Sequence, residues 1–430
     1  MNLRLISQRV RGMQDILPSE SKKWMALSNL LKRESKVYGF KLIRTPVLEH
    51  TEVFERSAGS TSDIVNKEMY TFEDRGKRSV TLRPEGTAGV LRAVLENGLH
   101  QGPLPIKLMY ESSCYRYEKP QVGRLREFFQ FGLEIFGTTS AIADAQLICL
   151  ARTIISRLGL RNIHLEINSI GCKKCREKYV DAIKKYFKDH TDKLCDTCLD
   201  RLSRNPLRIF DCKERDCRAI VDSAPTIIDY LCEDCFHYFT SLKNNLNEMD
   251  VVYNINPRIV RGLDYYTGSV FEFTTVIDGV NIAICGGGRY DGLSELMSGV
   301  KLPAVGLGFG MERLLAVMDK QGIDISESDK PAVYIAAVDE ESRSLACKLS
   351  EKLRSAHIYA EFDISNKSLK AQMKYADKIG AKYTIVIGED EIRTETAILK
   401  DMSTAKEHRI SLGDRFLFDF LSCKVEDFNG

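Results

Sequence analysis

The sequence lacks a long hydrophobic run. No stretch of the 430 residues approaches the ~18 consecutive apolar residues that a membrane-spanning helix needs. The segment around Arg4, Arg9 and Arg11 also lacks the continuous apolar centre of a secretory signal. From these absences we expect a soluble protein in the cytoplasm, without membrane contact.

An excess of one charge is lacking too. Lys and Arg together number 62, and Asp and Glu number 60, so the net charge does not predict a polyanionic partner. Any nucleic-acid binding must then come from local patches. With 43% hydrophobic and 28% charged residues, the composition is that of a globular protein. The length predicts two or three domains.

Two common nucleotide-binding patterns are missing as well. No GxxxxGK[ST] occurs, and GLGFG does not match GxGxxG, so neither a P-loop nor a dinucleotide fold is supported. Three glycine-bearing stretches, among them the one that contains GLGFG, each include an arginine. They are RGLDYYTGSVFEF with Arg261, CGGGRYDGL with Arg289 and GLGFGMER with Arg313. Such glycines let a backbone approach a ligand, which fits a nucleotide site of another kind. The alternative is turn glycines beside ion-paired arginines.

The order of hydrophobic patterns predicts the organisation of the chain. Helical spacing over residues 20–40, with Ser19 as N-cap, precedes a strand at 41–49. Pro46 interrupts this strand, which indicates an edge or an interface. After a polar linker at 320–331, short apolar strands alternate with helix-length segments, as is typical of a small α/β domain.

A basic hairpin is predicted over residues 115–137. Its basic residues are Arg116, Lys119, Arg124 and Arg126. Guanidinium groups match phosphate oxygens, so the hairpin could clamp phosphates, although a solvated hairpin with surface ion pairs is the alternative. The second strand of the hairpin places Gln130, Gly132 and Glu134 on one face, because side chains alternate along a strand. A polar face in an otherwise apolar strand favours a ligand.

Eight of the 13 cysteines fall within residues 172–235. They are Cys172, Cys175, Cys195, Cys198, Cys212, Cys217, Cys232 and Cys235. The first four read CxxC, nineteen residues, CxxC, which lies within the spacing of a zinc site. One or two structural Zn²⁺ ions are predicted, and reduced core cysteines are the alternative. The spacing does not say which cysteines share an ion. We expect Cys114, Cys149, Cys285, Cys347 and Cys423 to be packing residues.

These stretches together resemble the histidyl-tRNA synthetases, a family of class II aminoacyl-tRNA synthetases. The helix at 20–40 with its proline-bearing strand is similar to motif 1, YRYEKPQVGRLREF to motif 2 and GLGFGMER to motif 3. RGLDYY and GGGRYDGL are similar to the two signatures peculiar to the histidine enzymes. The resemblance runs from about Arg11 to about Gly413.

The resemblance implies the residues of a histidine site. Glu85, Thr87 and Gln130 would hold the α-amino group of histidine, and Glu134 and Tyr266 would face its imidazole. The assignment makes chemical sense, because one acceptor and one hydroxyl can distinguish the two ring nitrogens.

The resemblance also implies the residues of an ATP site. Arg116 would bind the α-phosphate, and Arg313 would lie along the nucleotide near the γ-phosphate. Arg124 and Tyr265 would line the same pocket. Arg261 and Arg116 would be the fixed cations that stabilise charge on the phosphate oxygens, together with Mg²⁺.

The implied activity is a histidine–tRNA ligase that forms histidyl-adenylate from histidine and ATP and transfers it to tRNA(His). The implied fold is an α+β catalytic domain with a mixed, mainly antiparallel sheet over 1–325, a Cys-rich insertion at 171–245 that packs over the acceptor stem, and a small α/β anticodon-binding domain at 331–430. A homodimer is implied by motif 1. Zinc is not a general family trait.

The first alternative to a histidine–tRNA ligase is a catalytically inactive paralogue that regulates histidine biosynthesis. It would be expected to lack the anticodon domain and active-site residues that this chain keeps. A general RNA-binding module is the second, but it does not explain Glu134 with Tyr266.

A lysine-bearing face is predicted in the C-terminal domain. Lys367, Lys370, Lys374 and Lys378 follow one another at three- and four-residue steps. The face could bind the anticodon, with Tyr375 as a stacking partner. The alternatives are a solvated face and a core tyrosine.

Overall fold

A computed structural model describes residues 8–58, 64–119, 124–204, 206–212, 214–259, 265–326 and 329–426. The chain divides into an N-terminal unit, Met1–Ser326, and a C-terminal unit, Glu327–Gly430. Within the described ranges, no helix has both the length and the apolar character needed to cross a membrane.

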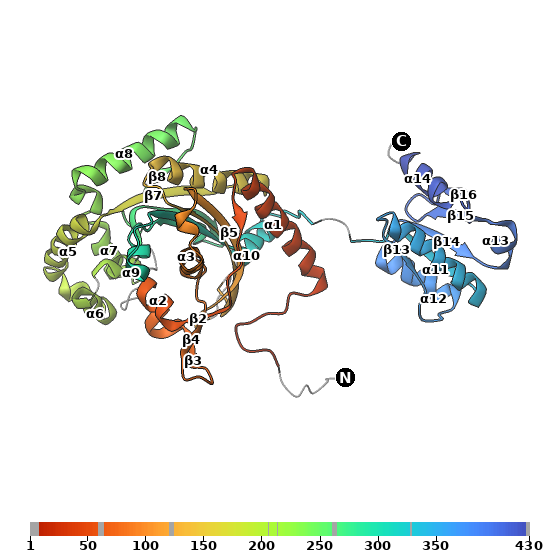
Figure 1. The fold of residues 1–430 in the computed structure, drawn as a ribbon, viewed down its shortest axis with the longest axis horizontal. Coiled ribbons are helices and arrows are strands. Elements are labelled where there is room, and N and C mark those ends of the chain that lie inside the picture. The colour runs from red at the N-terminus through yellow and green to blue at the C-terminus, as the bar shows by residue number, and fades with distance from the viewer. Residues whose placement is uncertain are drawn as a thin grey trace. The chain divides into compact units, whose positions relative to one another are not determined.

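A mainly antiparallel sheet is the centre of the N-terminal unit (Figure 1). Its strand order is β1 (Lys41–Leu42), β5 (Ile106–Tyr115), β6 (Glu127–Phe136), β11 (Ala304–Gly310), β10 (Val280–Arg289), β9 (Thr267–Ile277), β7 (His164–Gly171) and β8 (Asn254–Ile255). The only parallel pairs among these strands are β1 with β5 and β7 with β8, at the two edges. The predicted mixed, mainly antiparallel sheet is confirmed.

Helices cover both faces of this sheet. The main hydrophobic core lies on one face, under α1 (Pro18–Val37), α4 (Ala141–Arg157), α8 (Glu233–Glu248) and α10 (Met311–Lys320). A second core lies on the other face, beneath α3 (Thr87–Glu96) and α9 (Leu293–Ser298). Alternation along β6 sends Phe131, Leu133 and Ile135 into the main core and therefore turns Gln130 and Glu134 to the second face.

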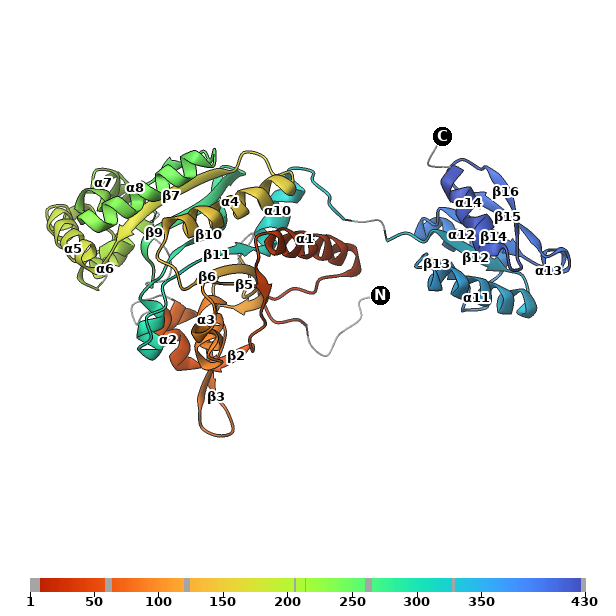
Figure 2. The ribbon, with the colours of Figure 1, turned by 45° about the horizontal axis from the view of Figure 1, so that its top comes forward.

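The predicted strand at 41–49 is interrupted at Pro46, as predicted, but its extent is wrong, because only residues 41–42 and 48–50 form strands. The chain forms β1 and then, after Pro46, β2 (Leu48–His50), which belongs to another sheet. That sheet has the order β2, β4 (Ser79–Leu82), β3 (Tyr70–Glu73) and is visible beside α2 (Thr51–Ala58) in Figure 2. Proline cannot donate to a strand ladder, so the chain leaves the first sheet there.

The predicted start of the first helix is also wrong. The N-cap of α1 is Leu17 rather than Ser19, and Pro18 occupies the first helical position. Proline is favoured there because its fixed φ suits a helix and its missing N–H would have no partner in any case.

The Cys-rich segment forms a small helical subdomain at the end of the sheet beyond β7 (Figures 1 and 2). Its helices are α5 (Lys173–Lys188), α6 (Asp196–Arg204), α7 (Arg215–Asp222) and the start of α8. Tyr179, Ile183, Phe187 and Ile209 contribute to a core of its own.

Short helical turns complete the N-terminal unit, namely η1 (Ile64–Glu68), η2 (Leu99–Gln101), η3 (Thr191–Lys193), η4 (Pro206–Asp211) and η5 (Ile227–Tyr230).

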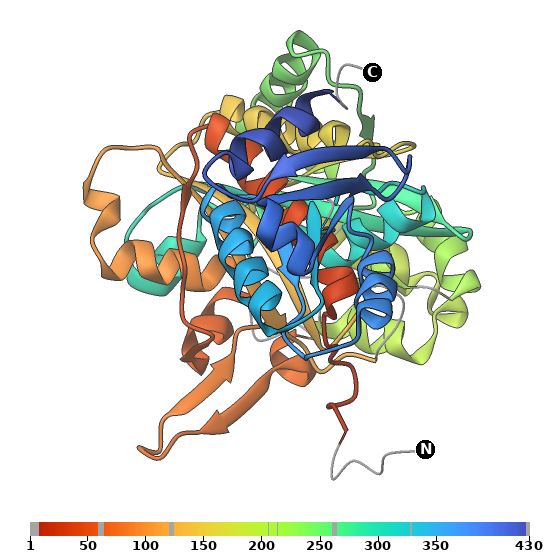
Figure 3. The ribbon, with the colours of Figure 1, turned by 90° about the vertical axis from the view of Figure 1, so that its right-hand side faces the viewer.

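The C-terminal unit is an α/β domain, as the strand pattern predicted. Its sheet has the order β13 (Ala360–Phe362), β12 (Val333–Ala337), β14 (Tyr383–Ile387), β15 (Thr396–Asp401), β16 (Glu407–Ser411). Alternate residues of β12 contribute to cores on its two faces, one shared with α11 (Glu340–Ser355) and α14 (Phe416–Glu426) and the other with α12 (Leu369–Ile379) (Figure 3). Helix α13 (Glu389–Thr394) follows β14.

Three details of this unit bear on the sequence predictions. Lys367 precedes α12, so only the other three lysines are helical, and its ammonium lies 4.9 Å from the centre of the Tyr375 ring. Tyr375 is 42% exposed, which excludes the reading as a core residue. Cys347 is exposed, and the prediction that it packs in the core is wrong.

Candidate active site

The second face of the large sheet carries two neighbouring rows of residues that are mostly glycine. Across β6, β11 and β10 the rows are Glu134, Gly306 and Gly288, and then Gly132, Gly308 and Gly286. A Cβ atom at Gly306 would collide with the carboxylate of Glu134, and one at Gly308 with the amide of Gln130. Because these glycines lack side chains, both polar groups can extend over the sheet and a ligand can approach its backbone.

Glu134 is a buried carboxylate that two hydroxyl groups hold. Thr87 Oγ1 donates to Glu134 Oε1 at 2.8 Å, and the Tyr290 hydroxyl donates to Oε2. The residue is 1% exposed. Burial raises the pKa of Glu134 to about 8, although the two hydroxyl donors act in the opposite direction. This carboxyl group can therefore gain or lose a proton near neutral pH when a ligand binds.

Glu85 is a second buried carboxylate, at the N-terminus of α3. It accepts hydrogen bonds from the backbone N–H groups of Thr87 at 2.6 Å and Ala88 at 2.8 Å. Burial raises the pKa of Glu85, and these bonds oppose the rise. Thr87 thus bonds to both carboxylates, through its backbone to Glu85 and through its hydroxyl to Glu134. Two carboxyl groups in one small site favour a ligand that is cationic or donates N–H bonds.

Aromatic rings surround Glu85, Thr87 and Glu134, and together these residues form one polar group. Tyr265 and Tyr266, which directly precede β9, are both buried, and their ring centres lie 4.8 Å apart. The Tyr290 ring lies 5.5 Å from that of Tyr265. The Tyr110 ring occupies the space over Gly132, because a Cβ atom there would collide with it. The walls fit a flat or partly apolar ligand.

A pocket of about 740 Å³ adjoins the polar group. Gln130 and Gly308 line one part of it, and they come from the same glycine-bearing face as Glu134. Among the described residues that line it, the cationic ones are Arg116, Arg124 and Arg313, and the acidic ones are Glu118, Glu272, Asp278 and Glu312. The pocket therefore combines a glycine floor with guanidinium groups, whose geometry matches phosphate oxygens.

Backbone carbonyls fix two of these arginines. Arg116 Nε donates to the Pro84 carbonyl at 2.8 Å, and one terminal nitrogen of Arg313 donates to the Ala283 carbonyl at 2.7 Å. Burial, followed by repulsion from Arg124, lowers the pKa of Arg313. The side chain of Arg124 is 48% exposed and lies 3.4 Å from Glu118. Arg116 and Arg313 are thus held in place, whereas Arg124 lies at the rim.

The suggestion that Arg289 belongs to a nucleotide site is wrong. Its guanidinium is 2.5 Å from the carboxylate of Asp144 and 2.9 Å from that of Asp291, and it also bonds to the Tyr238 hydroxyl. Arg289 is 2% exposed. The alternative of a buried, ion-paired arginine holds here, and Arg289 joins α4, α8 and β10.

Arg261 lies outside the described residues, so its predicted role stays a prediction. The other predicted site residues fall into two groups. One group belongs to the polar group or borders it, and it consists of Glu85, Thr87, Gln130, Glu134, Tyr265 and Tyr266. The other group lines the pocket, and it consists of Arg116, Arg124 and Arg313.

Sequence reasoning missed two residues of the polar group, Tyr290 and Tyr110. Tyr290 lies within the GGGRYDGL stretch, and its hydroxyl bonds directly to Glu134. Its position next to a glycine run was the available signal. Tyr110 gave no local signal, because only the pairing of β5 with β6 brings its ring over Gly132.

The eight clustered cysteines divide into two groups of four. Cys172, Cys175, Cys232 and Cys235 form one, and Cys195, Cys198, Cys212 and Cys217 form the other. In each group the four sulfurs lie within 4.8 Å of one another. The two neighbouring CxxC pairs at 172–198, whose spacing suggested a zinc site, therefore do not share one.

Comparison with known proteins gives consistent matches. The family model of histidyl-tRNA synthetase matches residues 12–175 and 217–314, and that of an anticodon binding domain matches 332–418. A histidine–tRNA ligase of Acetivibrio thermocellus is 49% identical over 95% of this chain and 98% of its own length. One from Clostridium perfringens is 49% identical over 94% and 97%.

A solved structure shares the arrangement. The histidyl-tRNA synthetase of S. aureus, in its apo form, superposes with a TM-score of 0.82 at 36% identity. The match covers 96% of this chain and all of the other. Both units of the present chain therefore have counterparts in one solved protein.

Proposed function

The chain belongs to the histidyl-tRNA synthetase family and is a histidine–tRNA ligase, and from this premise we propose how its residues divide the reaction between them. One observation carries the proposal. A group of buried carboxylates and tyrosines adjoins an arginine-lined pocket, and Gln130 and Gly308 line the boundary. Such a site can hold a small amino acid at one end and a nucleotide at the other.

Histidine binds at the polar end. Glu85, Thr87 and Gln130 hold the α-amino group, since Glu85 supplies the negative charge that an ammonium needs. Glu134 and Tyr266 face the imidazole. Thr87 and Tyr290 donate to Glu134, and they keep its carboxylate oriented for a ring N–H. Tyr265 lines this end of the site, and Arg124 lines the adjoining pocket.

ATP binds in the pocket. Arg116 contacts the α-phosphate, and Arg313 lies along the nucleotide towards the γ-phosphate. An Mg²⁺ ion bound together with ATP would offset the charge of the outer phosphates. The pocket also presents the carboxylates of Glu272 and Glu312, which an ion bound to those phosphates can approach. Because the carbonyl contacts already fix Arg116 and Arg313, little ordering is needed when ATP binds.

The first step joins the two substrates. A histidine carboxylate oxygen attacks the α-phosphorus, the bond to the bridging oxygen breaks, and pyrophosphate leaves. Negative charge grows on the α-phosphate oxygens, so the cations Arg116 and Arg261 stabilise the transition state. In the second step the 3′-terminal hydroxyl of tRNA(His) attacks the carbonyl carbon of the adenylate, and AMP leaves.

Transfer RNA contacts both units. The C-terminal unit binds the anticodon, and the exposed Tyr375 beside Lys367 offers a ring and a cation to an unpaired base. The Cys-rich subdomain approaches the acceptor stem. A cytoplasmic location is proposed on the same basis, because aminoacylated tRNA is consumed by translation.

A homodimer is proposed through the N-terminal helix and its strands. Large apolar side chains are exposed in this region of the single chain. They are Met25, Val37, Leu42, Val47 and Leu48. Exposed apolar side chains within one short segment of the chain favour burial against a partner, and a second copy offers the matching surface.

The division of roles predicts separate effects on the two substrates. Tyr290→Phe removes a hydroxyl that orients Glu134 and is expected to raise KM for histidine but not for ATP. Arg313→Gln is expected to do the reverse. ATP–pyrophosphate exchange with each substrate titrated in turn measures both. Tyr179→Phe, which removes a buried tyrosine hydroxyl in the Cys-rich subdomain, is the control. A higher KM for ATP in Tyr290→Phe, or for histidine in Arg313→Gln, would contradict the assignment.

A further inference from the structure

We propose that the eight cysteines form two separate zinc sites, and that the outer one, formed by Cys172, Cys175, Cys232 and Cys235, positions Tyr266 through the neighbouring Arg176. The inner site consists of Cys195, Cys198, Cys212 and Cys217. The proposal of two metal sites does not depend on the activity of the enzyme. The proposed effect on Tyr266 does depend on the proposed histidine site.

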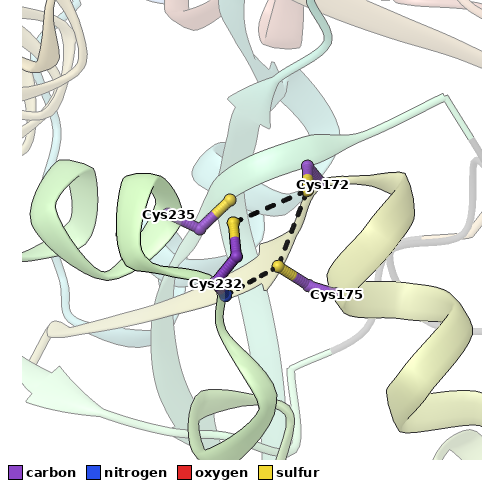
Figure 4. Close-up of side chains that lie close together, drawn as sticks. All are labelled: Cys172, Cys175, Cys232 and Cys235. Atoms are coloured by element: carbon purple, nitrogen blue, oxygen red, sulfur yellow. Dashed lines mark hydrogen bonds between the residues drawn. The ribbon is translucent and has the colours of Figure 1, made fainter.

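The outer site is built from the first turns of two helices. Cys172 is the N-cap of α5 and Cys232 is the N-cap of α8, and Cys175 and Cys235 follow three residues later. Figure 4 shows the four sulfurs turned towards one another. Cys172 Sγ lies 3.6 Å from Cys175 Sγ and 3.9 Å from Cys232 Sγ. A tetrahedral zinc ion with bonds of about 2.3 Å separates its sulfurs by about 3.8 Å, so the spacing fits one ion.

The inner site has the same dimensions. Cys195 Sγ lies 3.9 Å from Cys212 Sγ, and all four sulfurs lie within 4.8 Å of one another. Cys198 and Cys217 are buried on α6 and α7, while Cys195 and Cys212 lie in the connecting segments. One ion would therefore join two short helices to the segments that precede them.

Hydrogen bonds to sulfur favour thiolates at both sites. The backbone N–H of Cys232 donates to Cys175 Sγ at 3.0 Å, and that of Cys195 donates to Cys217 Sγ at 3.2 Å. At the outer site two helix N-termini add positive potential. Thiolates are the form that binds zinc.

Zinc binding explains the grouping of the cysteines better than core packing or disulfide bonds do. All eight thiols are free, and the sulfur distances far exceed the about 2.05 Å of a disulfide bond. Ordinary core cysteines have no reason to gather in fours with their sulfurs converging. The small core of the subdomain also provides a reason for metal, because little apolar surface is available to stabilise it.

The two sites are nested. The outer site joins the segment that enters the subdomain after β7 to the segment that leaves it through α8, and the inner site lies entirely between them. An ion at the outer site would thus close the loop at its base, where the subdomain meets the catalytic sheet. This loop closure reduces the conformational freedom of the unfolded chain.

The outer site is connected to the histidine site by a short path. Gly171, the last residue of β7, has a φ of +64°, and a Cβ atom there would lie 2.5 Å from Cys175 Cβ. Cys175 thus packs directly on the strand end. The next residue, Arg176, donates from its guanidinium to the backbone carbonyl of Tyr266 at 2.5 Å. An ion that fixes the first turn of α5 therefore fixes the donor that holds Tyr266, and Arg176 is a positioning residue.

Metal analysis of the full-length protein, purified with zinc supplied and without chelator, tests the sites. Two zinc ions per chain are expected. Cys235→Ser and Cys212→Ser are each expected to lose one ion, the double variant both, and the control Cys285→Ser none. Substitution by Co²⁺ should give the absorption bands of tetrahedral cobalt–thiolate coordination. Near-zero metal in the wild type, or one ion lost only when both groups are altered, would overturn the two-site proposal.

Steady-state ATP–pyrophosphate exchange tests the link to Tyr266. Cys235→Ser and Arg176→Ala are expected to raise KM for histidine about tenfold, the effect of losing a hydrogen bond from a charged donor, with KM for ATP unchanged. Arg176→Lys should restore part of the affinity. Cys212→Ser should leave KM for histidine unchanged, which separates positioning from general damage to the subdomain.

The possible failures are distinguishable. A Cys235→Ser protein that loses its ion but keeps the wild-type KM for histidine would overturn the link and leave the metal sites standing. Absence of histidine-dependent exchange in the wild type would overturn the proposed function instead. Zinc content would still report on the metal sites in that case, because it does not depend on activity.

Discussion

Substitution of Glu134 by glutamine probes the histidine site most closely. Glutamine keeps the size of the side chain and one oxygen acceptor but cannot carry the negative charge that Glu134 has when it is deprotonated. Glu134 is 1% exposed, so solvent cannot replace the lost interaction. A hydrogen bond to a charged group contributes about 1.5–3 kcal/mol, which corresponds to a loss of about 10- to 150-fold in kcat/KM for histidine.

Histidine-dependent ATP–pyrophosphate exchange measures this loss. The matched control is Glu166→Gln on β7, where Asn256 donates to the carboxylate at 2.9 Å outside the site. KM for ATP should stay the same in both variants. If Glu134→Gln kept the wild-type kcat/KM for histidine, Glu134 would not contact the imidazole and the proposed orientation of histidine would be wrong.

The same substitution should act in the opposite direction on stability. Glu134 has a pKa of about 8 in the folded chain against an ordinary value of 4.5, because burial disfavours its charge. The stabilisation by protonation is therefore complete below about 4.5 and is lost as the pH rises to about 8. Glu134→Gln does not titrate, so its Tm relative to wild type should increase across this window. A constant difference in Tm would contradict the raised pKa.

Three further predictions follow from the site and its surroundings. Arg261→His should lower adenylate formation about 100- to 1000-fold, and undiminished ATP–pyrophosphate exchange would reject its catalytic role. Gly306→Ala should reduce histidine activation at least as much as Glu134→Gln, because the added Cβ meets the Glu134 carboxylate, whereas Gly292→Ala, with open space around it, should have little effect in the same assay. Sedimentation at micromolar concentration should give the mass of a dimer, and a monomer would refute the proposed interface.

Elements with strong local patterns could be predicted from the sequence. The strands at 333–337, 360–362 and 383–387 occur where short apolar runs predicted them. The polar face of β6 was predictable because alternation with period two already separates Glu134 from its apolar neighbours. These features depend on residues that are close together in the chain.

Features that depend on distant contacts could not be predicted in this way. Arg289 follows a glycine run as a ligand-binding arginine would, but Asp144, far away in sequence, pairs with it in the fold. The cysteine spacing favoured the nearest CxxC pairs, whereas the return of the chain through α8 brings Cys232 to Cys172. Cys347 lies on a helix whose exposed face only the packing of the C-terminal unit defines.

Amino-acid-dependent ATP–pyrophosphate exchange, measured with each of the twenty amino acids in turn, tests the central claim most directly. The buried carboxylates Glu85 and Glu134 with the surrounding tyrosines are proposed to select histidine. The expected result is exchange with histidine and background rates with the other nineteen. Exchange with a different amino acid, or with none, would contradict the account.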